Sequence, residues 1–282
     1  MEEQRRFIVS ADWLEKRIGE PGLSIIDASW YLPAQNRDAE AEYDAAHIPG
    51  AVFFDHELVC DAGSKLPHTM PEPLTFERHA SSMGVTRNDT IVVYDGPGFF
   101  TAPRAWWMFR VMGAEKVYVL DGGFYRWRTQ GRPVTSEPTK IASAVFDPKV
   151  DRNAVVGFDE MLQLVREGGA QIADARSSGR YKGVEAEPRK GMRSGHMPGA
   201  VSVPVTSLSR DGSLLSRQAL EEHLRGCGLD PEKPVVATCG SGITAAAIVL
   251  ALAETGHDHA RLYDGSWSEW GGRDDTPVET SD

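Results

Sequence analysis

Short apolar runs alternate with segments of helical spacing along this chain, and the alternation occurs in both halves. In the first half, the β-branched run at 91–94 enters a glycine loop, and apolar residues recur at helical spacing over 102–112. In the second half, the run at 235–238 enters a similar loop, and 243–254 follows with the same spacing. Strands that alternate with helices favour a parallel sheet. The pattern therefore predicts an α/β fold in which each half has a central, mainly parallel sheet flanked by helices.

Landmarks recur in the same order in the two halves. They are an apolar run ending in Asp (25–28 and 171–175), a His-x-Pro-Gly-Ala-Val turn (47–52 and 196–201), the strand with its glycine loop, and a second strand ending in Asp-Gly before a Trp-containing segment (117–127 and 261–270). One matched strand and loop could arise by chance, but this ordered series indicates a tandem duplication. We predict domains at 1–138 and 154–282 with a linker at 139–153. Residues 274–282 are expected to form a frayed acidic tail.

Several polar residues are explained by local structure rather than by chemistry. Ser10, Thr75 and Ser216 each stand just before a segment with helical spacing, so we predict that they are helix N-caps. His47 and His196 belong to the repeated turn, and a structural role is expected for both.

Length and charge narrow the classes of function. A chain of 282 residues exceeds one ordinary core, which favours two domains. No apolar run approaches the roughly 20 residues that span a bilayer, and the opening MEEQRRFIVS does not resemble a secretory signal. A net charge of −11 without blocks of Lys and Arg argues against general nucleic-acid binding. We expect a cytoplasmic protein that binds neither membranes nor nucleic acid.

The three cysteines suggest chemistry at one position. Cys60, Cys227 and Cys239 form no CxxC pair, which fits neither a disulfide framework nor a structural zinc site, so reduced thiols are expected. Most lone cysteines are small buried apolar residues, and we interpret Cys227 in this way. Cys60 lies in a polar segment and is expected to be a spectator thiol, although a redox role stays open.

Cys239 differs because it follows a predicted strand and precedes a glycine loop and an alanine-rich helix. Gly240 and Gly242 permit unusual dihedral angles, so several backbone N–H groups can turn inward, and the helix start adds its positive end. Both effects favour a thiolate, which is the reactive form. Open α/β sheets bind ligands at this end of their strands. We therefore predict that Cys239 is a nucleophile, and that Asp95, at the matching position of the first half, leaves that half without one.

Residues 239–245, Cys-Gly-Ser-Gly-Ile-Thr-Ala, resemble the active-site loop of the rhodanese superfamily, and in particular of its 3-mercaptopyruvate sulfurtransferase branch. That branch usually has Val where Ile243 stands. Residues 27–33, 102–110 and 263–270 are also similar to family motifs, so the resemblance covers nearly the whole chain. It implies a sulfurtransferase that moves the sulfur of 3-mercaptopyruvate through a Cys239 persulfide and releases pyruvate. The implied acceptor is a thiol, such as thioredoxin or glutathione, or cyanide, and no metal or organic cofactor is implied.

The resemblance also implies site residues. Residues 179–189 are similar to the family segment whose two arginines hold the carboxylate and keto oxygens of the substrate, and the matching positions are Arg180 and Arg189. An arginine fork pairs with a carboxylate through two parallel hydrogen bonds. Loop residues Gly240, Gly242, Ile243 and Thr244 complete the implied substrate site.

A proton relay is implied as well. Segments 53–57 and 66–71 resemble those that supply a carboxylate and a histidine to the loop serine, so the relay would comprise Glu57, His68 and Ser241. A histidine between a carboxylate and a hydroxyl can pass a proton or orient a carbonyl. Arg104 is expected to assist from the domain interface.

Three other functions fit the sequence less well. A thiosulfate sulfurtransferase is the nearest alternative, but that branch typically carries basic residues in the loop, and here there are none. A cysteine phosphatase needs Arg at the sixth position after its cysteine, and position 245 is Ala. A non-catalytic rhodanese module that binds partners would be expected to lack the loop cysteine, and Cys239 is present.

Overall fold

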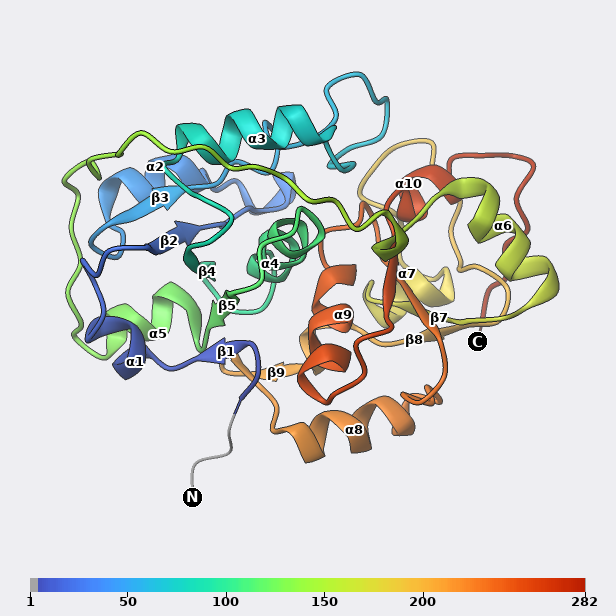
Figure 1. Ribbon diagram of the computed structural model, residues 1–282. Helices are drawn as coiled ribbons and strands as arrows, with labels where there is room; N and C mark the ends of the chain where they lie inside the picture. The colour runs from blue at the N-terminus through green and yellow to red at the C-terminus, as the bar shows by residue number, and fades with distance from the viewer. Residues whose placement is uncertain (1–4, 282) are drawn as a thin grey trace. The chain divides into compact units, whose positions relative to one another are not determined.

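Each half of the chain folds around its own five-stranded sheet. The computed structural model describes residues 5–281, and Figure 1 shows their helices and strands. The described residues form two units. The first consists of residues up to Ala62, Met70–Asp151 and Asp211–Leu214, and the second of Gly63–Thr69, Arg152–Arg210 and the residues from Leu215 onward. Each unit therefore includes a short segment that lies within the sequence of the other.

The sheet of the first unit has the strand order β1-β5-β4-β2-β3, and every pairing is parallel. Its strands are β1 (Ile8–Val9), β2 (Leu23–Asp27), β3 (Ala51–Phe53), β4 (Thr90–Tyr94) and β5 (Val117–Leu120). The central strand β4 is buried along its apolar run, as expected for a sheet covered on both faces.

Helices connect these strands. They are α1 (Ala11–Glu15), α2 (Ala39–Ala45), α3 (Pro73–Ser82), α4 (Ala102–Val111) and α5 (Gly123–Thr129), with a short 3-10 turn at Pro33–Gln35. Helix α4 follows the loop after β4, packs on β4 and β5, and buries every residue except Arg110.

The second sheet repeats the first, with the order β6-β12-β11-β7-β8 and parallel pairings throughout. Its strands are β6 (Val155–Val156), β7 (Gln171–Asp174), β8 (Ala200–Ser202), β11 (Val235–Thr238) and β12 (Arg261–Tyr263). Matching strands thus occupy matching places, which confirms the predicted α/β fold of two tandem domains.

The second unit's helices also match those of the first in order. They are α6 (Phe158–Glu167), α7 (Ser178–Lys182), α8 (Arg217–Gly226), α9 (Ala245–Glu254) and α10 (Ser266–Trp270), with 3-10 turns at Arg152–Ala154 and Val205–Ser207. Two further short strands, β9 (Ser209–Arg210) and β10 (Ser213–Leu214), precede α8 in the sequence, and β10 belongs to the first unit. Helix α9 packs on β11 and β12 and is buried over its whole length, which explains its almost wholly apolar sequence.

Two of the three predicted N-caps are confirmed. The hydroxyl of Ser10 accepts a hydrogen bond from Trp13 N, and Ser216 caps α8 in the same way. The prediction for Thr75 is wrong, because α3 begins at Pro73 with Glu72 at the N-cap. Proline has a backbone angle that suits the first helical position, so the helix starts earlier than Thr75 suggested.

The prediction of a frayed tail is also wrong for the described part of 274–282. The backbones of Glu279 and His196 exchange two hydrogen bonds of 2.8 and 2.9 Å, and Thr276 is buried. Trp270 Nε1 donates to the carbonyl of Pro277 at 2.8 Å. These backbone and indole contacts fix a segment whose polar composition gave no sign of pairing. Asp282 lies outside the described residues.

The segment predicted as a linker has neither helix nor strand up to Asp151. It packs on the first unit through Phe146, which is fully buried and stacks edge-on against Phe76 at 5.2 Å between ring centroids. The backbone of Lys149 also donates to Met112 O at 2.9 Å. This part of the chain is therefore anchored by side-chain packing rather than by secondary structure.

Candidate active site

The loop that carries Cys239 follows β11 directly and is fixed by the start of α10. The N–H of Cys239 donates to Ser266 Oγ at 3.2 Å, and its carbonyl accepts from Trp267 N at 2.9 Å. The carbonyl of Gly240 accepts from both the backbone and the hydroxyl of Ser268, at 2.8 and 2.6 Å. Hydrogen bonds thereby hold the backbone of the loop at Cys239 and Gly240, and Cys239 is only 2% exposed.

Several N–H groups of the loop have no acceptor. Within the described part of the chain, the backbone N–H groups of Gly240, Ser241, Ile243 and Thr244 donate to no other residue. Gly242 has a φ of +82°, a conformation that glycine adopts at little cost and that turns the loop toward α9. Ser241 and Ile243 are buried, and buried N–H groups are nearly always paired, so this set is a candidate for binding an anion.

The matching loop of the first unit shows what such a loop does with an anion. Asp95 takes the place of the cysteine and is fully buried. Its carboxylate accepts hydrogen bonds from the backbone N–H groups of Gly98, Phe100, Thr101 and Ala102, at 2.5, 2.9, 2.7 and 2.8 Å. A loop of this geometry therefore surrounds a negative charge at the position where the second unit has a thiol.

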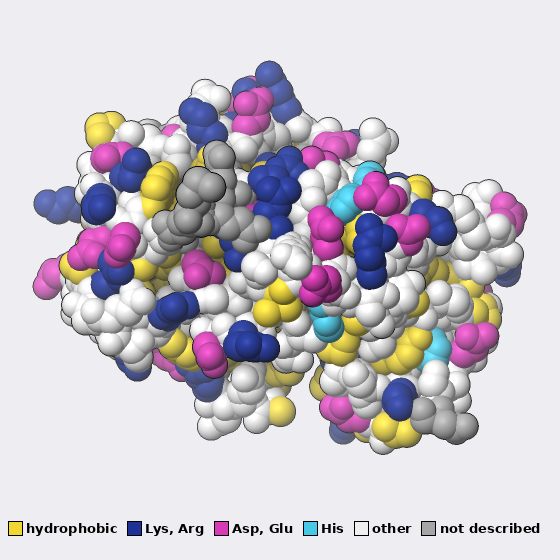
Figure 2. Space-filling view, turned by 90° about the horizontal axis from the view of Figure 1, so that it is seen from below, with side chains coloured by type: hydrophobic (Ala, Val, Ile, Leu, Met, Phe, Trp, Pro, Cys, Tyr) yellow, Lys and Arg dark blue, Asp and Glu magenta, His cyan; other side chains and the backbone are white. Residues whose placement is uncertain are grey.

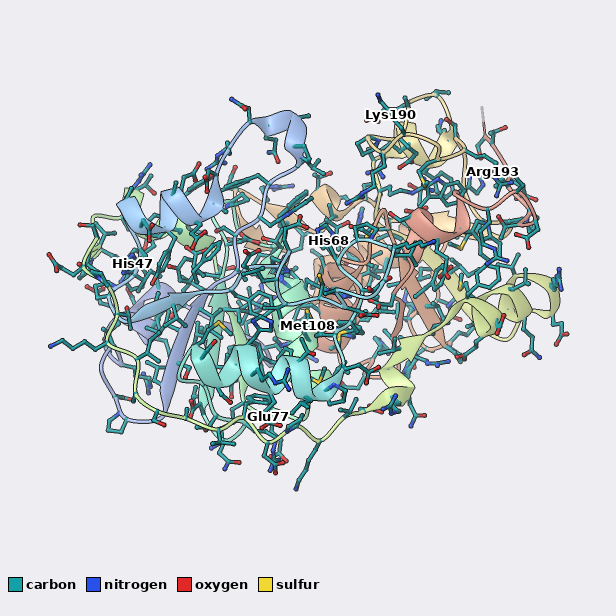
Figure 3. All side chains as sticks on the ribbon, turned by 90° about the horizontal axis from the view of Figure 1, so that it is seen from above. His47, His68, Glu77, Met108, Lys190 and Arg193 are labelled. Atoms are coloured by element: carbon teal, nitrogen blue, oxygen red, sulfur yellow. The ribbon has the colours of Figure 1, made fainter. Side chains whose placement is uncertain are left out.

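The structure brings Ser241 and His68 together. Ser241 Oγ lies 3.0 Å from Nδ1 of His68, and both side chains are buried. His68 is labelled in Figure 3 and belongs to Gly63–Thr69, the segment that clusters with the second unit. Its φ of +59° is uncommon for a residue with a side chain. Such strained residues concentrate at functional sites, and this one orients the imidazole toward the loop serine.

The remaining relay candidate lies in the first unit. Glu57 is exposed, and its Oε1 accepts a hydrogen bond of 2.8 Å from Trp30 Nε1. Arg104 also belongs to the first unit, where it is buried in α4 with its guanidinium 4.6 Å from the ring centre of Trp107. The roles of Glu57 and Arg104 in the reaction stay predictions.

Arg180 lies on α7 and its guanidinium faces the loop. A Cβ atom added to Gly240 would stand 3.0 Å from Nη2 of Arg180, so a side chain at position 240 would press on this arginine. Glycine at this position is therefore explained by close approach. Arg180 Nε and Nη2 donate to Glu187 at 3.2 and 2.5 Å.

Glu187 and Arg189 lie on a loop that the first unit lacks. In both units a tyrosine stacks on the histidine of the repeated turn, with ring centroids 4.2 Å apart for Tyr43 and His47 and 3.8 Å apart for Tyr181 and His196. The histidine follows its tyrosine by 4 positions in the first unit and by 15 in the second. The extra residues form the loop, and Lys190 on it is exposed (Figure 3). The stacking also supports the predicted structural role of the two histidines.

Sequence reasoning missed a buried arginine behind this loop. Arg176 has a side chain with 0% exposure, and it donates to Asp174 Oδ2 at 2.6 Å, Glu187 Oε1 at 2.7 Å and the carbonyl of Gly195 at 2.8 Å. Burial alone would lower the pKa of Arg176, but the two carboxylates outweigh burial and raise the pKa. The first half reads Asp27-Ala-Ser where the second reads Asp174-Ala-Arg. That difference within a repeated motif was the available signal.

A family model for the rhodanese-like domain matches residues 10–130 and 158–273, one match in each half. The chain belongs to the rhodanese-like domain family. The 3-mercaptopyruvate sulfurtransferase of Escherichia coli strain K12 is 43% identical over 274 residues, covering 97% of this chain and 98% of the relative. The thiosulfate sulfurtransferase of Gallus gallus is 42% identical, covering 94% and 93%. Among solved structures, SseA from E. coli superposes with a TM-score of 0.86 at 40% identity over 93% of this chain and 98% of that one.

The other two thiols of this rhodanese-like chain are distant from Cys239 in sequence, and each lies against a residue outside the loop of Cys239. Cys227 is partly exposed rather than fully buried as predicted, because it ends α8, where its Sγ lies 3.7 Å from His223 Nε2. Burial nevertheless raises the pKa of the Cys227 thiol, which reduces its thiolate fraction. Cys60 Sγ donates to the carbonyl of Glu57 at 3.0 Å. All three cysteines are thiols outside any disulfide.

On the face drawn in Figure 2, basic and acidic side chains are interspersed singly and in small groups. Among residues 5–281, no three His, Cys, Asp or Glu side chains gather as a metal site. Over the same residues, every helix is too short or too polar to cross a bilayer.

Proposed function

We propose that this protein is a sulfurtransferase that takes sulfur from 3-mercaptopyruvate and carries it on Cys239 as a persulfide. The observation that carries the proposal is the cysteine loop, whose N–H groups at Gly240, Ser241, Ile243 and Thr244 have no acceptor among the described residues. The first unit offers support, because the matching loop surrounds the Asp95 carboxylate with N–H donors. Both a thiolate and a persulfide anion would satisfy such donors.

In the proposed reaction, Arg180 and Arg189 bind the carboxylate and keto oxygens of 3-mercaptopyruvate. The Cys239 thiolate attacks the sulfur of the donor, so that a sulfur–sulfur bond forms and the carbon–sulfur bond breaks. The electron pair of the broken bond passes to the pyruvate fragment, which leaves as its enolate. Arginine forks suit this task because they orient a planar keto acid and stabilise the developing enolate charge.

We propose that His68 and Ser241 supply the proton that turns the enolate into pyruvate, with Glu57 as the third member of the relay. The 3.0 Å separation of Ser241 Oγ and His68 Nδ1 supports this step. A thiol acceptor then attacks the outer sulfur of the persulfide, which forms the acceptor persulfide and returns Cys239 as a thiolate. Thioredoxin and glutathione have the chemistry to act as this thiol acceptor, and cyanide can attack the same outer sulfur, which gives thiocyanate and the Cys239 thiolate. Three cysteines outside any disulfide are consistent with a reducing compartment such as the cytoplasm, which we propose as the location.

Thiosulfate is the second candidate donor, because the chicken relative at 42% identity is a thiosulfate sulfurtransferase. The loop weighs against it here. Residues 240–244 include no Lys or Arg, and position 245 is a buried alanine at the first turn of α9. A cation within the loop would stabilise a bound dianion, whereas a keto acid can be bound by Arg180 and Arg189, which lie outside the loop.

Steady-state kinetics test the proposal. The specificity constant kcat/KM is measured with 3-mercaptopyruvate and with thiosulfate, using cyanide as a common acceptor and detecting thiocyanate. The proposal predicts a clear preference for 3-mercaptopyruvate. A preference for thiosulfate would overturn the assigned donor while leaving Cys239 as the nucleophile.

A further inference from the structure

Behind the cysteine loop, the second unit contains a chain of four alternating charges. Asp174, Arg176 and Glu187 have side chains that are 1%, 0% and 4% exposed, and Arg180 at the outer end is 15% exposed. Glu187 joins the two arginines, because its Oε1 accepts from Arg176 Nη1 at 2.7 Å and its Oε2 accepts from Arg180 Nη2 at 2.5 Å. A charge this deeply buried is stable only when paired.

This arrangement fixes the direction of the Arg180 guanidinium. Nε and Nη2 of Arg180 are engaged by Glu187, while Nη1 donates to no residue that the structure describes. The Nη2 end of the guanidinium lies nearest the loop, since a Cβ atom on Gly240 would stand 3.0 Å from Nη2 and 3.9 Å from Nη1. Arg176 holds Glu187 in turn through its bonds to Asp174 and to the carbonyl of Gly195. Arg180 is therefore aimed at the space beside the loop by a rigid, buried support.

The same contacts cancel the charge of Arg180. Asp174 and Glu187 contribute two negative charges, and Arg176 and Arg180 two positive charges, so the group is neutral. Arg180 then offers hydrogen-bond donors to a ligand without offering a net positive charge. Of the two arginines proposed to bind the substrate, only Arg189 lies outside this group. Such a site favours a donor with one negative charge over a donor with two.

We propose that Glu187 is a positioning residue for Arg180, and that its negative charge selects a monoanionic keto-acid donor over a dianion such as thiosulfate. This inference rests on the proposed function, because it concerns the donor that reacts at Cys239. The first unit, which has no loop cysteine, is consistent with this pairing of Glu187 and Arg180. The residue before the stacked tyrosine is Glu42 there and Arg180 here, and the loop that carries Glu187 is absent from the first unit.

The test compares the ratio of kcat/KM for thiosulfate to kcat/KM for 3-mercaptopyruvate in wild type and in Glu187→Gln. Removing one negative charge near a partly buried ligand changes the preference between a dianion and a monoanion by about tenfold, or about 1.4 kcal/mol. We expect the ratio to rise by roughly that factor. The matched control is Glu185→Gln, which removes a carboxylate two residues earlier on the same loop. Glu185 is exposed and accepts from Ser177 Oγ at 2.7 Å, so the control ratio should stay at the wild-type value.

A second variant separates position from charge. Glu187→Asp keeps the charge but is too short to hold both arginines, so a misplaced Arg180 should raise KM for both donors alike while the ratio stays within about twofold of wild type. It also provides a test if Glu187→Gln does not fold, because a raised ratio in the Asp variant would contradict charge selection. An unchanged ratio in Glu187→Gln would overturn the inference, as would an equal rise in Glu185→Gln. Wild-type kinetics report on the proposed function separately, because a wild type that prefers thiosulfate refutes the donor assignment whatever the variants do.

Discussion

Arg176→Met tests how much the buried group of four charges depends on this arginine for the stability of the second unit. The substitution keeps an unbranched side chain against Trp267, whose ring centre lies 4.1 Å from the guanidinium carbon, but it removes every polar contact of the guanidinium. Asp174 then keeps only its hydrogen bond of 2.9 Å from the Arg176 backbone, and Glu187 keeps only Arg180. Removing one partner of a buried ion pair costs about 3–5 kcal/mol. We expect a loss of this size in the free energy of unfolding.

The chain offers a matched control in Arg273. It also binds an aspartate two residues away through two hydrogen bonds, of 2.9 Å each to Asp275, and it also lies over an aromatic ring, Phe158, at 3.9 Å. Its side chain is 42% exposed, whereas that of Arg176 is 0% exposed. Exposed pairs contribute less than about 1 kcal/mol, so Arg273→Met should cost little.

Urea unfolding measures both losses, and hydrogen exchange in peptides from β7 and β11 assigns the transition to the second unit. The double variant Asp174→Leu with Arg176→Met should recover much of the loss, because an apolar pair of similar volume often replaces a buried ion pair without cost. If Arg176→Met costs no more than Arg273→Met, the reasoning from burial is wrong.

Four further variants give direct outcomes. Cys239→Ser should abolish sulfur transfer while Cys227→Ser retains most of it, and equal losses would remove the basis for choosing between the thiols. Gly240→Ala should raise KM for 3-mercaptopyruvate by roughly five- to tenfold, about 1–1.4 kcal/mol, because its Cβ would lie 3.0 Å from Arg180 Nη2; unchanged KM would show that this approach is not needed. Burial raises the pKa of Asp27 from 3.8 to about 6, so the folded state binds this proton more tightly and loses stability as pH rises between these values. Asp27→Asn lacks the effect, and its stability relative to wild type should improve by up to about 3 kcal/mol from pH 4 to pH 7 in urea titrations; a difference independent of pH would contradict it.

The sequence predicted the fold well because the evidence for it is local and repeated. Strand runs such as 91–94 and 235–238 are short, apolar and followed by glycine, so their type and their place in a parallel sheet can be inferred from periodicity. The position of Cys239 at the end of β11 followed from the same pattern.

Long-range contacts could not be predicted in this way. His68 and Ser241 are 173 positions apart, and only resemblance to a family suggested that they act together. The support behind Arg180 was missed for another reason. Arg176 and Glu187 lie in a segment rich in charges, and charged residues in such a segment are usually exposed. Arg176 is buried against Trp267 and donates to the carbonyl of Gly195, and both of these residues lie outside the segment in the sequence.

The tail shows the same limit, since its polar composition predicted disorder. Glu279 pairs through its backbone with His196, and a backbone hydrogen bond does not depend on the side chain that the composition describes. Burial of Thr276 and the indole bond from Trp270 to Pro277 fix the segment further.

The most direct test of the account is the mass of the protein after reaction with 3-mercaptopyruvate in the absence of an acceptor. Intact-protein and peptide mass spectrometry should find one added sulfur atom, located on the peptide that contains Cys239, and the addition should disappear when cyanide or a thiol is supplied. An unmodified Cys239, or sulfur added only to Cys60 or Cys227, would contradict the claim that this loop holds a persulfide.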